Sequence, residues 1–319
     1  MPALSDPPRA GGPALHRSAA ALAAADPEAA PLWEREIRAV CPRPGARRSR
    51  LAASGDPVEW AFAWPGEDLR LTCDPAPGAG AAQRLRAAAA LCGAGLSAAQ
   101  SLDVRRLRGW GADGGRYGGW VGSRRRDGRM ARKLYVEIVS GAPWRRWTPA
   151  APLADPGVPS RSLVPVMAGF DAESGGVEVY CRTPAVHPQL LAALLRAAGL
   201  PPRADELVAE VARVTGRAVR AELPGADQGV SLGWGPDGGV RTLTWYTHAE
   251  MLFGPAARTR EAWLAAGRAR GWSMRAYAAL SAPDAAGRTP WHGLAGFAVG
   301  HAGPVAASVT CTPRAEEDR

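Results

Sequence analysis

Apolar and polar residues alternate along many short stretches of the chain, which is the pattern of β-strands with one buried face. Residues 58–64 and 133–137 show it most clearly, since every second residue in them is apolar. Turn signals rich in Gly, Asp and Pro join most of these stretches into hairpins. Five strand pairs and one further strand are predicted, at about residues 58–64 and 69–73, 116–122 and 131–139, 163–170 and 177–182, 230–234 and 240–247, 292–299 and 304–311, and 272–279.

The segments between the pairs are rich in alanine and carry apolar residues at helical spacing, so they are predicted to be amphipathic helices. Trp33, Ile37 and Val40 form such a stripe. Helices are predicted at about residues 16–41, 80–93, 97–108, 186–198, 203–214 and 255–269. Residues 1–13 are predicted to be a disordered segment, 14–312 a single domain and 313–319 a charged tail.

The hairpins repeat along the chain. Gly-Gly-Val-Glu-Val-Tyr at 175–180 and Gly-Gly-Val-Arg-Thr-Leu at 238–243 both follow a turn that contains aspartate, and both open a second strand. Their alignment places Glu178 over Arg241 at an offset of 63 residues, which is also the separation of Arg70 and Lys133. Equivalent places in the five hairpins are therefore assigned to Arg70, Lys133, Glu178, Arg241 and Ala306.

Ten antiparallel strands leave two unpaired edges unless the sheet closes, and closure into a barrel removes both. Helices would cover the outer apolar face, and the alternate residues would line the inside. The predicted fold class is α+β, a ten-stranded antiparallel barrel surrounded by helices. Its predicted lining includes Arg70, Thr72, Lys133, Tyr135, Glu178, Tyr180, Arg182, Arg241 and Trp245.

Charge narrows the choice of partners. The net charge of +9 permits an anionic ligand, a nucleic acid or an anionic membrane. The basic residues are scattered, and no zinc-finger spacing or RNA-binding signature is found, which disfavours nucleic acid. Lys133 is the only lysine among 39 basic residues. A lysine is a compact point charge and arginine a planar fork, so either this position needs a point charge or an arginine-biased sequence kept one lysine by chance.

The remaining composition points to the cytoplasm. The five cysteines are far apart and never form a CxxC pair, which favours reduced thiols over disulfides or a zinc site. No secretion signal is recognised, and no apolar run reaches the ~18 residues of a membrane span. We therefore expect a cytoplasmic protein that does not insert into membranes.

These features resemble the ABBA aromatic prenyltransferases, the PT-barrel enzymes of natural-product biosynthesis, over about residues 50–312. Residues 130–135, Met-Ala-Arg-Lys-Leu-Tyr, resemble the family's Lys-x-Tyr strand, 177–180 its second polar-x-Tyr strand and 239–241 its arginine-bearing strand. The resemblance implies a barrel of repeated αββα units. It also implies transfer of an isoprenoid, dimethylallyl or geranyl, from an allylic diphosphate to an electron-rich aromatic acceptor of the indole or phenol type in secondary metabolism.

The resemblance also implies roles for individual residues. The diphosphate would be bound by Arg70, Lys133, Arg241 and Arg182, the prenyl cation would be shielded by Tyr135, Tyr180 and Trp245, and Glu178 would be the catalytic base. The chain departs from the family pattern at Ala306, where a cation is usual, and at Glu178, where a lysine or an amide is expected. The expected partners are a prenyl diphosphate and a small aromatic acceptor, with no nucleic acid and no membrane, and the expected state is a monomer.

No cofactor and no metal are expected. Arg70 stands where some family members have a metal-binding carboxylate, and the DDxxD motif that binds magnesium diphosphate in other prenyl-transferring folds is absent. Activity is therefore predicted to be independent of magnesium.

Two alternative functions that do not involve catalysis are also compatible with the sequence. Ala306 and Glu178 suggest a non-catalytic barrel that binds an anionic amphiphile. The net charge suggests a nucleic-acid binder, which would carry its arginines on an outer patch, whereas the enzyme requires Lys133 and Arg241 to face inward.

Overall fold

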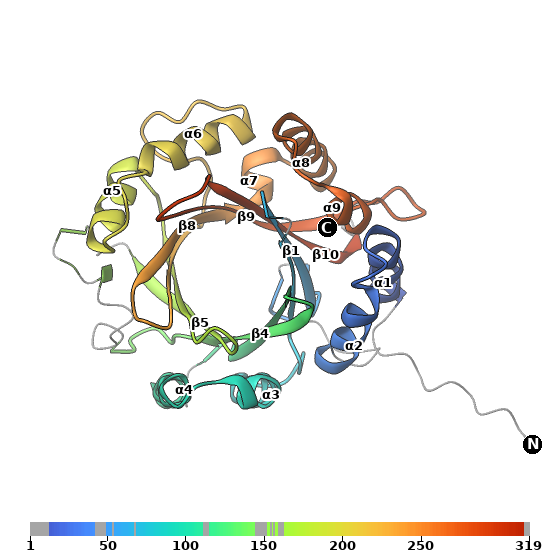
Figure 1. Cartoon of the computed structure of the whole chain (residues 1–319), viewed down its shortest axis with the longest axis horizontal. Helices are drawn as coiled ribbons and strands as arrows, with labels where there is room; N and C mark the ends of the chain where they lie inside the picture. Colours follow the sequence, from blue (N-terminus) through green and yellow to red (C-terminus); the bar gives the residue numbers. More distant parts are fainter. Residues whose placement is uncertain are drawn as a thin grey trace, which may run out of the picture.

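A computed structural model describes residues 13–41, 49–52, 54–66, 68–110, 115–143, 152–153, 155, 157–158 and 163–315. Within these residues ten strands close into a barrel in the order β1-β10-β9-β8-β7-β6-β5-β4-β3-β2, and every neighbouring pair is antiparallel. Helices surround the barrel (Figure 1), so the predicted fold class is confirmed. Apart from Pro13, the segment predicted to be disordered lies outside the described residues.

The strands are β1 Val58–Trp64, β2 Asp68–Cys73, β3 Gly119–Arg126, β4 Arg129–Glu137, β5 Val164–Asp171, β6 Val177–Thr183, β7 Gln228–Trp234, β8 Val240–His248, β9 Pro290–Gly300 and β10 Ala306–Ala315. Five short connections, β1–β2, β3–β4, β5–β6, β7–β8 and β9–β10, lie at one end of the barrel, which we call the hairpin end. Strand β10 continues to Ala315, so residues 313–315, predicted to belong to a tail, are part of the sheet.

The helices are α1 Pro13–Ala25, α2 Ala30–Val40, α3 Ala81–Cys92, α4 Ala98–Trp110, α5 Pro188–Ala197, α6 Ala204–Thr215, α7 Ala249–Phe253, α8 Ala256–Arg270 and α9 Arg275–Leu280, with a 3₁₀ turn η1 at Gly93–Gly95. None of them is long and apolar enough to cross a membrane within the described part of the chain.

The predictions for three segments need correction. The single helix predicted at 16–41 is two helices, because a turn separates α1 from α2 and the Asp26 carboxylate accepts the Ala29 N–H at 3.1 Å. The strand predicted at 272–279 is helix α9, in which the buried Tyr277 and Leu280 are three residues apart, as on one helix face. Helix α7 was not predicted.

The apolar core lies between the barrel and the helices. In β1, Val58, Trp60, Phe62 and Trp64 are buried, whereas the alternate residues between them are partly exposed. Trp33 of α2 packs on Trp60 with ring centroids 5.5 Å apart, and Trp263 of α8 stacks on Trp64 at 5.4 Å. The outward residues are thus covered by helices, and the partial exposure of the inward residues shows that the barrel interior keeps solvent-accessible space.

Helix α2 is tied to the outer wall by charge as well. The guanidinium of Arg132 on β4 donates two hydrogen bonds to Glu36, at 2.7 and 2.9 Å, and Ser123 of β3 donates a third at 2.6 Å. Arg132 therefore points outward, and its neighbour Lys133 points into the barrel because side chains alternate along a strand.

Candidate active site in the barrel interior

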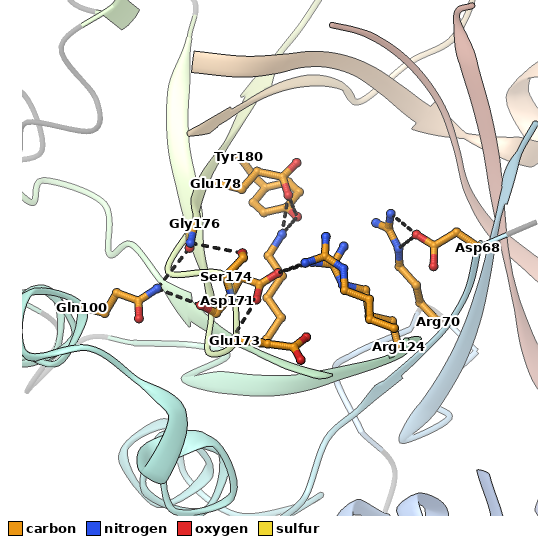
Figure 2. Close-up of polar contacts among 12 residues, drawn as sticks. Asp68, Arg70, Gln100, Arg124, Asp171, Glu173, Ser174, Gly176, Glu178 and Tyr180 are labelled. Carbon is orange, nitrogen blue, oxygen red and sulfur yellow. Dashed lines mark hydrogen bonds and ion pairs between the residues drawn. The ribbon is translucent and has the colours of Figure 1, made fainter. Parts of the chain in front are cut away.

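Three cationic side chains point inward from adjacent strands near the hairpin end: Arg70 of β2, Arg124 of β3 and Lys133 of β4. Arg70 is the cross-strand partner of Arg124, and Lys133 is the partner of Gly122, two residues from Arg124 on the same face. The side chains of Arg70 and Arg124 extend side by side into the barrel in Figure 2. The predicted inward positions of Arg70 and Lys133 are confirmed.

Arg124 was missed because the predicted strand ends at residue 122, two residues before Arg124. The actual turn is only Asp127 and Gly128, and the ladder begins at once with Arg126 opposite Arg129. Asp-Gly is a strong signal for a two-residue hairpin turn. Applied strictly, it would have extended the strand to Arg126 and placed Arg124 inside the barrel.

Lys133 lies at the centre of a hydrogen-bonded group that includes Glu178 and Tyr180. Its ammonium donates to the Glu178 carboxylate and, at 3.0 Å, to the Tyr180 hydroxyl. The same ammonium lies 5.2 Å from the ring centroid of Tyr135 and 5.3 Å from that of Tyr180. Burial and the Glu178 charge raise the pKa of Tyr180 well above its usual value, so its hydroxyl keeps its proton and donates to Glu178 at 2.6 Å.

Glu178 is held in its ionised form. Burial alone would raise its pKa, but the Lys133 charge and hydrogen bonds from Lys133, Ser231 and Tyr180 outweigh burial and lower the pKa to about 2. Ser231 donates to the second carboxylate oxygen at 2.6 Å. Both oxygens are therefore engaged and the proton affinity is low, which makes the predicted role of catalytic base chemically unfavourable.

The two arginines are also paired with carboxylates. Arg70 donates to Asp68 at 2.8 and 2.5 Å, and Arg124 donates to Asp171. Asp171 also accepts two backbone N–H bonds from the following turn, at 3.1 and 2.9 Å, and Gln100 of α4 donates to its carbonyl at 3.0 Å. Burial would raise the pKa of Asp171, but these backbone bonds and Arg124 together lower it. Figure 2 shows the whole arrangement.

Three tyrosines line the interior beside the cations: Tyr135 of β4, Tyr180 of β6 and Tyr246 of β8. The ring centroids of Tyr135 and Tyr180 are 6.0 Å apart, and those of Tyr180 and Tyr246 are 6.3 Å apart. The Tyr246 hydroxyl donates to the Cys181 carbonyl at 2.9 Å, which fixes its ring. The inward positions predicted for Tyr135 and Tyr180 are confirmed, and Tyr246 was missed.

The inward position predicted for Trp245 is wrong. Trp245 is fully buried in the outer core, stacks on Phe297 at 5.8 Å and donates its indole N–H to Gln228 at 2.8 Å. The ladder between β7 and β8 shifts between Gly233 and Trp234, so Thr242, not Arg241, shares the cross-strand row of Glu178. A shift of one residue exchanges the two faces of a strand, and the even-numbered residues of β8 from Thr242 onward therefore face inward.

The same shift removes Arg241 from the cluster, so its predicted inward position is also wrong. Its side chain is 53% exposed at the hairpin end and pairs with Asp237 of the turn. Arg182 does not join the cluster either, because it lies near the opposite end of β6, is 58% exposed and pairs with Asp227 at 2.5 Å. Ala306 pairs with Ala298 of β9 in a part of the wall lined by small residues.

A further inward carboxyl group, Glu59 of β1, was missed. It shares one cross-strand row with Thr72, Gly122 and Lys133, and Thr310 of β10 donates to it at 2.7 Å. Burial raises its pKa, the Thr310 hydrogen bond lowers it in part, and the result is about 7. Glu59 can therefore exchange a proton near neutral pH. The sequence signal was available, because Glu59 is the one charged residue in the alternating strand 58–64.

Glycines on neighbouring strands make room for the large inward side chains. A Cβ at Gly122 would lie 2.8 Å from the Tyr135 ring, one at Gly169 would lie 2.3 Å from Lys133 Cε, and one at Gly229 would lie 2.1 Å from the Tyr246 ring. Contacts this short are excluded by van der Waals repulsion. Lys133 and the two tyrosines can therefore occupy their positions only because the residues facing them are glycines.

We expect the substitution Gly169→Ala to displace the Lys133 side chain and to weaken binding of inorganic pyrophosphate about threefold, or about 0.7 kcal/mol. The fold should survive, because the clashing atom belongs to the end of a flexible side chain. Titration calorimetry measures the affinity. Gly66→Ala, where a Cβ meets nothing within 4 Å, is the matched control. Equal affinities in the two variants would show that Gly169 does not position Lys133.

No metal site accompanies these residues. Among the residues that the structure describes, no three His, Cys, Asp or Glu side chains lie close enough together to hold a metal ion. Magnesium independence stays a prediction.

The chain is similar in structure to several solved prenyltransferases. These include 6-dimethylallyltryptophan synthase from Micromonospora olivasterospora in complex with DMASPP and Trp (TM-score 0.72, 17% identity, 94% of this chain and 96% of that chain covered). They also include 5-dimethylallyltryptophan synthase from Streptomyces coelicolor (TM-score 0.73, 15% identity, 98% of this chain and 100% of that chain covered). A third is the prenyltransferase PriB in complex with L-tryptophan and dimethylallyl thiolodiphosphate (TM-score 0.69, 15% identity, 94% of this chain and 95% of that chain covered). No family model and no curated protein matches the sequence. The chain therefore has the PT-barrel fold of these prenyltransferases over almost its whole length.

Proposed function

We propose that this protein is an aromatic prenyltransferase, which transfers an isoprenoid from an allylic diphosphate to an electron-rich aromatic acceptor. The observation that carries the proposal is the group of Arg70, Arg124 and Lys133 beside three tyrosines inside a closed barrel. The complexes of similar barrels with DMASPP and Trp, and with L-tryptophan and dimethylallyl thiolodiphosphate, support it. A nucleic-acid binder would not need cations on the inside.

The first chemical step breaks the bond between the allylic carbon and the diphosphate oxygen, and the electron pair leaves with the diphosphate. Arg70, Arg124 and Lys133 stabilise the charge that develops there, since fixed cations in a water-poor site act strongly on a leaving anion. The remaining allylic fragment is a cation. Aromatic faces attract cations by about 0.5–2 kcal/mol each, so Tyr135, Tyr180 and Tyr246 shield it, and the barrel wall limits its reaction with water.

In the second step a ring carbon of the acceptor attacks the allylic cation, forms the new C–C bond and then loses its proton. We assign the proton-accepting role to Glu59, whose pKa of about 7 suits a base at neutral pH. Its carboxylate can also accept a hydrogen bond from the N–H or O–H of an indole or phenol, which increases the electron density of the ring. Glu178 is unsuited to this role because its pKa is low and its oxygens are engaged.

The proposed donors are dimethylallyl and geranyl diphosphate. We propose activity without magnesium, because the interior arginines and lysine supply the positive charge that a metal ion would otherwise provide. A cytoplasmic, monomeric enzyme is proposed, and the five cysteines, all buried and free, agree with a reducing compartment.

The test is to incubate the protein with each diphosphate and with tryptophan, indole or a phenol in the presence of EDTA. Release of pyrophosphate together with a product heavier by one prenyl group is the expected result. Binding of the diphosphate without its cleavage, across all acceptors, would contradict the proposal and favour the non-catalytic barrel.

A further inference from the structure

We propose that Glu178 holds Lys133 in an internal ion pair that the diphosphate must open, so that Glu178 limits the affinity of the site for diphosphate. This inference rests on the proposed function. It concerns a charge inside the barrel that would repel the substrate, and it assigns to Glu178 a role other than that of a base.

The cation cluster is neutralised from within. Each of the three inward cations pairs with a carboxylate: Asp68 with Arg70, Asp171 with Arg124 and Glu178 with Lys133. Asp171 also lies 3.9 Å from the guanidinium of Arg126. The positive charge of the cluster is therefore offset by neighbouring carboxylates. A diphosphate carries several negative charges, so it must displace or outweigh these carboxylates to gain from the cations.

The three ion pairs differ in how many N–H donors the cation still has available for a ligand. A guanidinium has five N–H donors, so Arg70 and Arg124 can hold a carboxylate and a phosphate oxygen together. An ammonium has three, and Lys133 already uses two of them, on Glu178 and on Tyr180. Lys133 is thus the cation that a diphosphate cannot use fully until its ion pair opens.

Glu178 keeps other hydrogen-bond donors when Lys133 leaves it. Asp171 orders the turn after β5 through two backbone hydrogen bonds, but Glu178 makes no such bond in the described residues. After Lys133 moves away, Glu178 keeps the hydrogen bonds from Ser231 and Tyr180. Lys133 has a flexible four-carbon stem and Gly169 beside it, so it can turn from Glu178 toward a phosphate.

The test is the affinity of the whole protein for inorganic pyrophosphate, measured by titration calorimetry in the wild type and in Glu178→Gln. Glutamine keeps the shape but removes the charge; its amide oxygen can still accept the hydrogen bond from Ser231, and its amide N–H can donate to the Tyr180 hydroxyl in place of the bond that Tyr180 donates to Glu178. We expect pyrophosphate to bind at least about tenfold more tightly to the variant, because Lys133 no longer has to leave an ion pair with Glu178 to reach the phosphate. Asp237→Asn, the matched control, removes the same charge at the same end of the barrel from the exposed pair with Arg241, and it should change the affinity less than about twofold.

A second variant locates the gain at Lys133. Lys133→Met should weaken pyrophosphate binding only a few-fold in the wild-type background, where the lysine is already paired. In the Glu178→Gln background it should abolish the whole gain, and this difference is the coupling that a double-mutant cycle measures. Purely structural damage from Lys133→Met would lower the pyrophosphate affinity by the same factor in both backgrounds.

The single lysine gives a direct readout that needs no variant. Protein labelled with ¹⁵N-lysine has one side-chain ammonium signal, that of Lys133. Saturating pyrophosphate should shift this signal in the wild type, because the ammonium exchanges a carboxylate partner for a phosphate.

The outcomes separate the inference from the proposed function. No gain in Glu178→Gln, an equal gain in Asp237→Asn, or an unshifted lysine signal with pyrophosphate bound would each overturn the inference and leave the proposed function standing. Failure of both wild type and Glu178→Gln to bind pyrophosphate would contradict the proposed function itself.

Discussion

Replacing Lys133 by methionine is expected to lower kcat for prenyl transfer on the order of 10²–10³-fold, the usual effect of removing one group that stabilises a leaving anion. Methionine keeps the unbranched stem of the side chain, which ends one atom short of the lysine ammonium, but it has no charge to offer to the diphosphate. The loss should appear mainly in kcat, because the negative charge on the leaving group grows as the bond breaks. Initial rates with dimethylallyl diphosphate and the best acceptor measure it.

Arg196→Met is the control for the loss of one positive charge from the protein. Arg196 is exposed on helix α5, outside the barrel, and its replacement should leave the rate within about twofold. Thermal unfolding should show that both variants remain folded. An unchanged rate in Lys133→Met would remove this residue from the mechanism and with it the main argument for a diphosphate site.

Replacing Glu59 by glutamine is expected to lower kcat on the order of 10²–10⁴-fold, as for loss of a general base. The pH profile makes the test specific. The pKa of Glu59 is raised to about 7, so the basic, ionised form is lost as the pH falls through this value, and wild-type activity should rise with pH across it. Glutamine can still accept the hydrogen bond from Thr310 but does not titrate, so the residual activity of the variant should lack this limb.

Rates measured between about pH 5.5 and 9 distinguish this role from a structural one. Glu34→Gln is the control, since Glu34 lies on the exposed face of helix α2 with a side chain that is 49% exposed. It should keep both the rate and the pH profile of the wild type. A Glu59→Gln variant with the wild-type limb near pH 7 would show that another group is the base.

The overall fold could be predicted because its information is local and repeated. Alternation in a stretch such as 58–64 assigns each residue to one face, and paired strands with short turns recur five times. Closure followed from the need to pair the two edges. Arg70, Lys133, Tyr135 and Tyr180 were placed inside correctly because no irregularity lies between each of them and its hairpin turn.

The predictions for Trp245 and Arg241 failed because of a register shift between β7 and β8, between Gly233 and Trp234. Its only trace in the sequence is that the apolar residues Val240 and Leu243 are three apart, before alternation resumes at Leu243 and Trp245. The shift moved Tyr246 into the place given to Trp245. Helix α9 was predicted to be a strand because its few residues fit both the two-residue period of a strand and the 3.6-residue period of a helix. Its packing against α1 and the barrel determines that it is a helix.

The most direct test of the account is a crystal structure with dimethylallyl thiolodiphosphate, a donor analogue that resists cleavage. We predict phosphate oxygens within hydrogen-bonding distance of Arg70, Arg124 and Lys133, with the dimethylallyl group between Tyr135, Tyr180 and Tyr246. A diphosphate bound instead at the exposed Arg182 or Arg241, or on the outer surface, would contradict a prenyl-transfer site inside the barrel.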